Sequence, residues 1–239
     1  MASIKTRLTS LLLKLATRVS GADERLLGVD IGVSRLRVVE LEKKGKSWVT
    51  ILHDEEPIDH SMAADEFEAA EVAFRELQSR NKIKTKNVAI SLQLSRSVVQ
   101  VITIPLMSEL EIESAIEFDS LWQNLVALPE DISQYSIVYQ IINRKPSTNQ
   151  MDILFVATLK SEIKQITDRF INRGMQPVLL DLRPFALRSS LLVNRPDLTG
   201  STFAMVEVGV TENYVLVVGD DNLALAELFV SDQDRMDLQ

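Results

Sequence analysis

The feature of this sequence that most limits its fold is a short turn pattern that occurs twice. Residues 29–34 read VDIGVS and residues 206–211 read VEVGVT. After a valine, each copy has an acid, an apolar residue, glycine, valine and a hydroxyl residue. In both copies an apolar strand leads into the turn and two further strand-like segments follow it. Two copies of one unit predict a duplicated fold whose halves face each other across a cleft.

The first copy opens a longer unit. Strands are predicted at 26–32, 35–42 and 47–52, followed by a helix at 63–80 and a strand at 87–92. Together these make a βββαβ unit, in which residues 53–62 are predicted to form a loop. In the helix, Phe67, Ala70, Phe74 and Leu77 recur at three- and four-residue steps and predict one buried face.

The middle of the chain predicts a compact α+β module. We expect strands at 97–105, 132–142, 151–159 and 178–182, and helices from Ser108 to about residue 126, at 161–173 and at 184–193. Ser108 and Glu111 have the spacing of a capping box at the start of the first of these helices. After a linker-like segment at 194–200, strands at 203–208, 214–218 and 223–230 repeat the opening layout, and the second copy stops there.

Composition excludes several classes of function. The chain has 26 Lys and Arg against 34 Asp and Glu, a formal net charge of -8, which argues against nucleic-acid binding. It has no cysteine, which removes disulfides and thiolate metal sites and fits a reducing compartment. No apolar run approaches the about 18 residues of a membrane-spanning helix, so the chain is not expected to cross a bilayer by itself.

Residues 1–20 differ from the rest in charge, because they contain Lys5, Arg7, Lys14 and Arg18 and no acid. The apolar residues among them recur at helical steps and are Ile4, Leu8, Leu11, Leu12, Leu15 and Val19. Two interpretations of this amphipathic basic helix remain open. It either lies on an anionic membrane surface or packs on its own domain or on a partner. The contact residues in either case are Lys5, Leu8, Leu11, Leu12, Lys14, Leu15 and Arg18.

An acid at the end of a strand, followed by glycine and a hydroxyl residue in a tight turn, suits phosphate binding. Backbone N–H groups and hydroxyls of the turn can face a phosphate, while the acid holds Mg²⁺ through water. A single turn of this kind also occurs for ordinary turn reasons. Two turns in the same register are similar to the two phosphate turns of the actin, sugar kinase and heat-shock ATPase superfamily.

More narrowly, the chain resembles the family of the type IV pilus assembly protein PilM, an actin-like relative of the cell-division protein FtsA. Residues 26–41, 101–139 and 152–187 and the turn at Glu207 carry the resemblance. It implies an α/β actin-like ATPase fold of the ribonuclease H-like class, with an α+β insert and an incomplete second half. Residues 21–96 and 183–198 would form subdomain 1A, residues 97–182 an inserted 1C-type subdomain, and residues 199–239 the start of subdomain 2A.

The same resemblance implies a part in an assembly platform. It implies a cytoplasmic protein held at the bacterial inner membrane by the short cytoplasmic tail of PilN, bound in a groove between subdomains 1A and 1C. We therefore expect a scaffold, not an enzyme, that binds a PilN-like tail, links it to the assembly motor ATPases and contacts the membrane peripherally. Related platforms of the MSHA pilus and of type II secretion systems remain alternatives.

The resemblance also implies residues that would bind ATP with Mg²⁺. They are Asp30, Gly32, Ser34 and Arg37 in the first turn and Glu207, Gly209 and Thr211 in the second, with Asp30 and Glu207 holding Mg²⁺ through water.

Three departures from the family pattern weaken this chemistry. Val33 replaces a hydroxyl residue, Arg35 stands at a usual serine position, and Glu207 replaces an aspartate although Mg²⁺ demands near-ideal octahedral geometry. The family's adenine-contacting segment would lie beyond residue 239, so we expect either a fragment or a shortened relative. The scaffold hypothesis is preferred, with an ATP-binding switch of the same fold as the alternative.

Other residues with chemical potential have simpler interpretations. A solvated acidic loop is preferred to a metal site at His53 and His60. Glu117 and Asp119 face different directions on a helix, so surface charge is preferred to an acid–base pair. Trp122 is predicted to be a core residue. A small-molecule kinase would need a catalytic aspartate and a complete second domain, and the sequence shows neither.

Overall fold

The computed structural model of the protein describes residues 25–61, 65–117, 122, 125–209 and 212–237. The predicted helix at 1–20, Asp119 and Thr211 therefore lie outside the described residues. The chain divides into two compact units, one of residues 1–93 with 164–186 and the other of residues 94–163 with 187–239. The assignment of segments to subdomains 1A, 1C and 2A stays a prediction.

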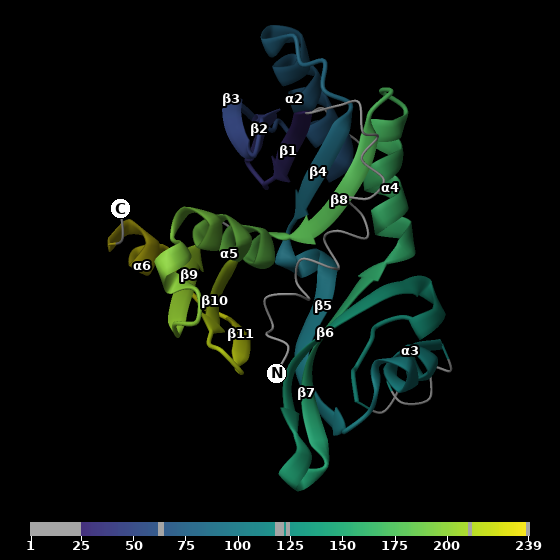
Figure 1. The fold of residues 1–239 in the computed structure, drawn as a ribbon. Coiled ribbons are helices and arrows are strands. Elements are labelled where there is room, and N and C mark those ends of the chain that lie inside the picture. Colours follow the sequence, from purple (N-terminus) through teal and green to yellow (C-terminus); the bar gives the residue numbers. More distant parts are fainter. Residues whose placement is uncertain (1–24, 62–64, 118–121, 123–124, 210–211, 238–239) are drawn as a thin grey trace. The chain divides into compact units, whose positions relative to one another are not determined.

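The first unit is built on a five-stranded sheet in the order β3-β2-β1-β4-β8 (Figure 1). Its strands are β1 Arg25–Ile31, β2 Arg35–Lys44, β3 Ser47–Pro57, β4 Asn87–Leu92 and β8 Gln176–Leu182. The first three form an antiparallel meander, and β4 pairs in parallel with β1 and with β8. Because α2 (Glu66–Asn81) joins β3 to β4, the predicted βββαβ unit is confirmed.

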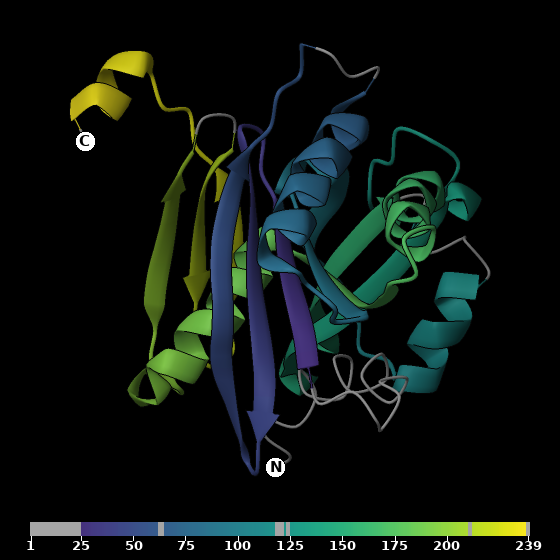
Figure 2. The same cartoon turned by 90° about the horizontal axis from the view of Figure 1, so that it is seen from above.

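Two helices meet in this unit, α2 and the greater part of α4 (Lys160–Ile171). Figure 2 shows α2 lying along the strands of the meander, and its main contacts are with β2 and β3. The predicted apolar face of α2 is buried, and the ring of Phe74 meets that of Phe170 on α4 edge to face at 5.2 Å between centroids. Asp65 caps α2 by accepting a hydrogen bond from the Glu68 backbone N–H.

The loop predicted at 53–62 is wrong for its first five residues, because β3 continues to Pro57. Charged side chains on this part of β3 find partners on neighbouring elements. Arg80 of α2 donates to Asp54 at 3.0 Å and to Glu56 at 2.6 Å. Hydrogen bonds from Asn81 and Arg80 lower the pKa of Asp54 to about 2. A run of acids that looks like a solvated loop in sequence is thus a strand paired with basic residues.

The second unit contains a three-stranded antiparallel sheet in the order β5-β7-β6. The strands are β5 Ser97–Pro105, β6 Tyr135–Lys145 and β7 Gln150–Leu159, and α3 spans Glu109–Glu117. The capping box is confirmed, since the Ser108 N–H donates to the Glu111 carboxylate at 2.6 Å and the Glu111 N–H donates to the Ser108 hydroxyl at 3.3 Å. The strand predicted from 132 begins only at Tyr135, because Asp131 caps a 3-10 turn at Ile132–Gln134.

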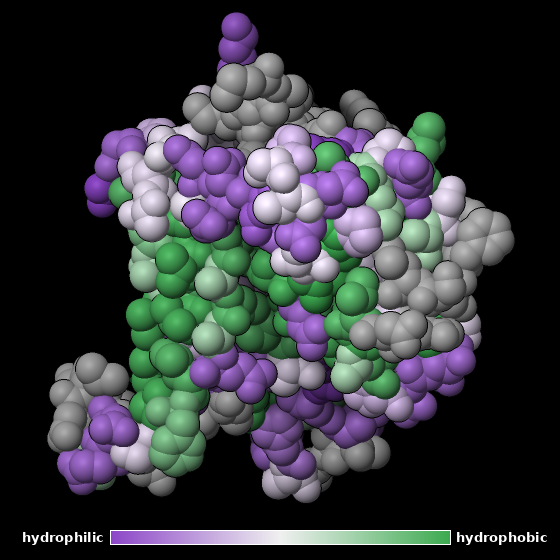
Figure 3. Space-filling view, turned by 90° about the horizontal axis from the view of Figure 1, so that it is seen from below, coloured by the Kyte–Doolittle hydropathy of each residue, from purple (hydrophilic) through white to green (hydrophobic). Residues whose placement is uncertain are grey.

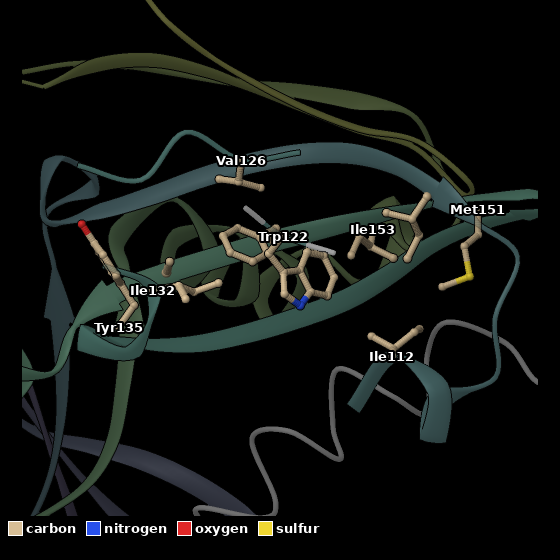
Figure 4. Packing of buried hydrophobic residues seen from close by; sticks show 10 residues of the cluster. Ile112, Trp122, Val126, Ile132, Tyr135, Met151 and Ile153 are labelled. Carbon is tan, nitrogen blue, oxygen red and sulfur yellow. The ribbon is translucent and has the colours of Figure 1, made fainter. Parts of the chain in front are cut away.

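Figure 4 shows the apolar core that this sheet shares with α3 and the segment after it. Trp122 is fully buried, and its ring lies 5.3 Å from that of Phe155, measured between centroids. The prediction that Trp122 is a core residue is therefore confirmed. Its neighbours in the cluster are mainly branched aliphatic residues and include Ile112, Val126, Ile132 and Ile153.

A second antiparallel sheet of this unit has the order β11-β10-β9. Its strands are β9 Phe203–Val208, β10 Asn213–Val218 and β11 Leu223–Glu227; α5 (Arg183–Asn194) precedes them and α6 (Asp232–Asp237) follows. Tyr214, Leu216 and Val218 point to a buried face, whereas Val206 on the opposite face is 62% exposed. Figure 3 shows apolar side chains gathered over this sheet.

Within the described residues, no helix is long and apolar enough to span a membrane.

Candidate functional site

The two turns predicted from the repeated pattern are closed by the same backbone hydrogen bond. In the first, the Gly32 N–H donates to the Arg35 carbonyl at 3.0 Å, and in the second the Gly209 N–H donates to the Glu212 carbonyl at 3.0 Å. The register also agrees, because Asp30 pairs with Arg37 and Glu207 pairs with Tyr214. The repeat is therefore confirmed for the two hairpins taken individually. That they face each other across a cleft stays a prediction.

Each turn needs glycine for a steric reason. A Cβ atom at Gly32 would stand 2.8 Å from the Arg35 carbonyl oxygen, and one at Gly209 would stand 2.8 Å from the Glu212 carbonyl oxygen. The obstacle in both cases is backbone, which cannot move aside as a side chain can. Any other residue at either position would have to open the hairpin.

We expect Gly32→Ala and Gly209→Ala each to lower the free energy of unfolding by about 1–3 kcal/mol, the usual cost of forcing atoms into a closed space. Urea denaturation followed by circular dichroism measures the loss. Ser34→Ala is the matched control for the first turn, since Ser34 is exposed and its change is expected to stay within about 0.5 kcal/mol. A Gly32→Ala protein as stable as this control would contradict the steric argument.

The carboxylate of Asp30 is held between two arginines. Arg183 Nε lies 3.1 Å from Asp30 Oδ1, and Arg37 Nη1 lies 3.4 Å from Asp30 Oδ2. A second nitrogen of Arg183, Nη2, donates to the Ile31 carbonyl oxygen at 3.1 Å. Arg37 also contacts Glu55 of β3 at 3.2 Å, and Arg35 pairs with the same carboxylate. The ion-pair partner of Arg35 is therefore Glu55 and not Asp30.

This arrangement does not fit the binding of a hydrated magnesium ion at Asp30. Both carboxylate oxygens already accept from a guanidinium group. Magnesium keeps several waters in a strict octahedron, and the two guanidinium cations already beside this acid oppose the approach of a further cation. The Gly32 N–H is also engaged, because it closes the hairpin. Ser34 is exposed, and its part in phosphate binding stays a prediction.

The second hairpin offers fewer groups in the described residues. Glu207 is half-buried on β9, and the Gly209 N–H is engaged within the turn. Glu212, which sequence reasoning did not single out, is buried, and its carboxylate accepts from the Ser95 backbone N–H at 2.9 Å. The carboxylate next to this turn thus ties the hairpin to the segment that leads into β5.

Arg183 was also missed from the sequence. It follows β8 directly and begins α5. An arginine before a proline at the start of a helix carries no sequence signal of a binding site. Only the strand order shows its importance, because β8 is separated from β1 by β4 alone. A long side chain at the end of β8 can then reach the acid at the end of β1.

The two histidines have different surroundings. His53 lies on β3, and His60 Nε2 lies 2.6 Å from the Val33 carbonyl oxygen, so His60 contacts the first turn. Among the residues that the structure describes, no group of three or more His, Cys, Asp or Glu could hold a metal ion.

A pocket in the first unit lies between α2 and α4, above the ends of β1 and β2. Its apolar lining is Ile31, Leu36, Phe67, Ala70, Phe74, Ile166 and Phe170. Three charged residues complete it, and Glu71 accepts hydrogen bonds from Arg169 at 2.8 Å and from Arg173 at 2.7 Å. Burial raises the pKa of Glu71, but the bonds from Arg173 and Arg169 outweigh it, so the net pKa is lowered. The pocket is an apolar recess with a paired charged rim.

Comparison with known proteins shows which family and which solved structures this chain is similar to. The sequence model of the type IV pilus assembly protein PilM family matches residues 28–227. A solved structure of a PilM–PilN type IV pilus biogenesis complex is similar, with a TM-score of 0.71 and 19% identity over 89% of this chain and 63% of that one. A Bacteroides thetaiotaomicron protein with an actin-like ATPase fold and unknown function gives a TM-score of 0.52 and 12% identity over 91% of this chain and 75% of that one.

At such identities the structural likeness shows the fold, and the predicted actin-like fold is confirmed. The chain spans 63% of the length of the matched chain in the PilM–PilN complex. No curated protein matches the sequence.

Proposed function

Since this chain belongs to the family of the type IV pilus assembly protein PilM, we propose that it is a scaffold of the pilus assembly platform at the bacterial inner membrane. In this function it binds the cytoplasmic tail of a PilN-like membrane protein and links that protein to the assembly motor ATPases. It acts in the cytoplasm, peripheral to the membrane, and is not an enzyme. The family match over residues 28–227 is the observation that carries the proposal.

Two further observations support a binding function. The similar solved structure is a complex of PilM with PilN, which makes a PilN-like protein the first partner to test. The pocket between α2 and α4 is an apolar recess with a charged rim, and we propose it as the place where an apolar side chain of a bound peptide makes contact. We therefore assign this pocket to the recognition of the tail.

The state of Asp30 favours the scaffold over an ATP-binding switch. Its two oxygens are engaged by Arg183 and Arg37, so nucleotide with magnesium would first have to break an existing ion pair. Micromolar binding of ATP with Mg²⁺ that is lost on Asp30→Ala would establish the switch instead.

The tail pocket is tested by calorimetry of the protein with a synthetic peptide of the PilN-like tail. Ala70→Leu should weaken peptide binding at least about tenfold, because Ala70 lines the pocket and three added carbons would fill the space needed by the ligand. Val72→Leu on the same helix is the control, since Val72 is 47% exposed and outside the pocket lining. Its affinity should equal that of the unmodified protein.

Equal affinities for all three proteins would move the peptide to another surface and end the assignment of this pocket. Binding too weak to measure in the unmodified protein, with the peptide in large excess, would count against the scaffold proposal itself.

A further inference from the structure

We propose that Arg183 is a permanent internal counterion, which holds the position at Asp30 that a divalent cation would otherwise occupy. The inference goes beyond the scaffold function, because it concerns how the first hairpin is stabilised without metal. Arg183 contacts oxygen atoms of two consecutive residues. Nε lies 3.1 Å from a carboxylate oxygen of Asp30, and Nη2 lies 3.1 Å from the carbonyl oxygen of Ile31.

A carboxylate oxygen beside a backbone carbonyl oxygen is the kind of ligand pair that hard cations such as Mg²⁺ and Ca²⁺ select. Here a guanidinium group contacts both. It also lies close to the turn, since a Cβ atom at Gly32 would stand 3.7 Å from Arg183 Nη2. A planar cation with fixed donors therefore contacts the acid and the backbone next to the glycine turn.

Arg183 is more buried than the other arginines of this cluster. Its side chain is 14% exposed, against 55% for Arg37 and 47% for Arg35. An exposed ion pair contributes little to stability, because water and salt screen it, whereas a shielded pair is costly to break. Arg37 and Arg35 are therefore outer charges, and Arg183 is the inner partner of Asp30.

The backbone fixes where this cation stands. Arg183 is the first residue of α5 and directly follows β8, and the next residue is Pro184, whose ring suits the first turn of a helix. Strand pairing holds β8 to β4 and β4 to β1, so Arg183, which directly follows β8, stands near Asp30 on β1. The pair thus braces the start of α5 against the first turn.

The test is divalent-cation rescue, followed by thermal melting of the full chain. The unmodified protein, Asp30→Asn, Arg183→Gln and the double variant are melted in millimolar MgCl₂ and in NaCl of equal ionic strength. We expect no specific effect of Mg²⁺ on the midpoint of the unmodified protein. Arg183→Gln should melt lower, and Mg²⁺ should restore part of the loss, because it can bind the freed oxygens of Asp30 and Ile31.

The double variant should show no Mg²⁺ response and should lose less than the sum of the two single losses, since both changes break the same pair. Arg37→Gln makes the same chemical change at the exposed partner and should lower the midpoint less than Arg183→Gln. If Arg183→Gln does not fold, Arg183→Lys keeps a cation beside Asp30, so its midpoint should lie below that of the unmodified protein and should show no specific rise with Mg²⁺.

Two results would overturn the proposal. One is a specific rise of the unmodified protein's midpoint with Mg²⁺ that disappears in Asp30→Asn, which would show that metal enters despite Arg183. The other is an Arg183→Gln protein that melts like the unmodified protein or ignores Mg²⁺, or an Arg183→Lys protein that Mg²⁺ specifically stabilises. Neither result involves the peptide, so the scaffold function stands or falls separately.

Discussion

Replacing Trp122 with alanine is expected to lower the free energy of unfolding of its unit by about 3–5 kcal/mol, the range measured for large aromatic residues removed from a core. Trp122 is fully buried and stacks at a tilt against Phe155 of β7. Figure 4 shows the indole in the middle of the cluster, so its loss removes contacts on several sides at once. Urea denaturation followed by far-ultraviolet circular dichroism gives the change.

The chain provides its own control, because it has two tryptophans. Trp48 on β3 is 49% exposed, and Trp48→Ala is expected to cost no more than about 1 kcal/mol. In that variant all tryptophan emission comes from Trp122, which should be blue-shifted and protected from an added quencher. Equal losses for the two substitutions, or a quenched Trp122, would show that the cluster does not form the core of the sheet β5-β7-β6.

Local patterns in the sequence predicted those parts of the fold that depend on local physics. Strand β5 has the predicted limits, because a run rich in β-branched residues ends at Pro105, which cannot continue a sheet ladder. Strand β9 has the predicted limits because a glycine turn ends it. The capping box at Ser108 depends on two side chains three residues apart, so it too is readable from sequence.

The errors come from partners that are distant in sequence. Residues 53–57 contain two adjacent glutamates and an aspartate, and alone they favour solvent. Arg80, Arg37 and Arg35 supply the missing charge, and two of these lie on another strand while the third lies on a helix. The spacing of residues within 53–57 carries no information about partners on other elements, so the predicted strand ends before β3 does.

The candidate site shows the same limit. The repeated turn predicted Asp30 and Gly32 correctly as parts of a hairpin, and the structure places both there. The chemistry of that hairpin, however, depends on Arg183, which is remote in sequence and is brought close by the parallel pairing of β8, β4 and β1. The turn motif predicts the backbone of this hairpin, whereas the strand order determines that Arg183 reaches Asp30.

Asp181 on β8 gives the second large effect, and its sign depends on pH. Burial raises the pKa of Asp181 to about 6, well above the ordinary value of 3.8. Between these two values the folded chain keeps a proton that the unfolded chain has lost, so stability falls as the pH rises through this window. Above it the charged, half-buried carboxylate costs about 2–3 kcal/mol, at roughly 1.4 kcal/mol for each unit of pKa.

Asp181→Asn should therefore stabilise the protein by about 2–3 kcal/mol near pH 7 and by close to nothing near pH 4, because asparagine cannot ionise. Its side-chain oxygen can still accept the Leu182 N–H, as Asp181 Oδ1 does at 2.8 Å. Urea midpoints measured across this pH range give the comparison.

Asp197→Asn is the control of opposite sign. Its exposed carboxylate pairs with Arg195 at 2.7 Å, and the hydrogen bond from Arg195 lowers its pKa. A lowered pKa adds stability above the ordinary value, so Asp197→Asn should lose a little stability at neutral pH and lose less as the pH falls. If Asp181→Asn behaved like this control, the Asp181 carboxylate would be solvated, and β8 would be less buried at Asp181 than the fold requires.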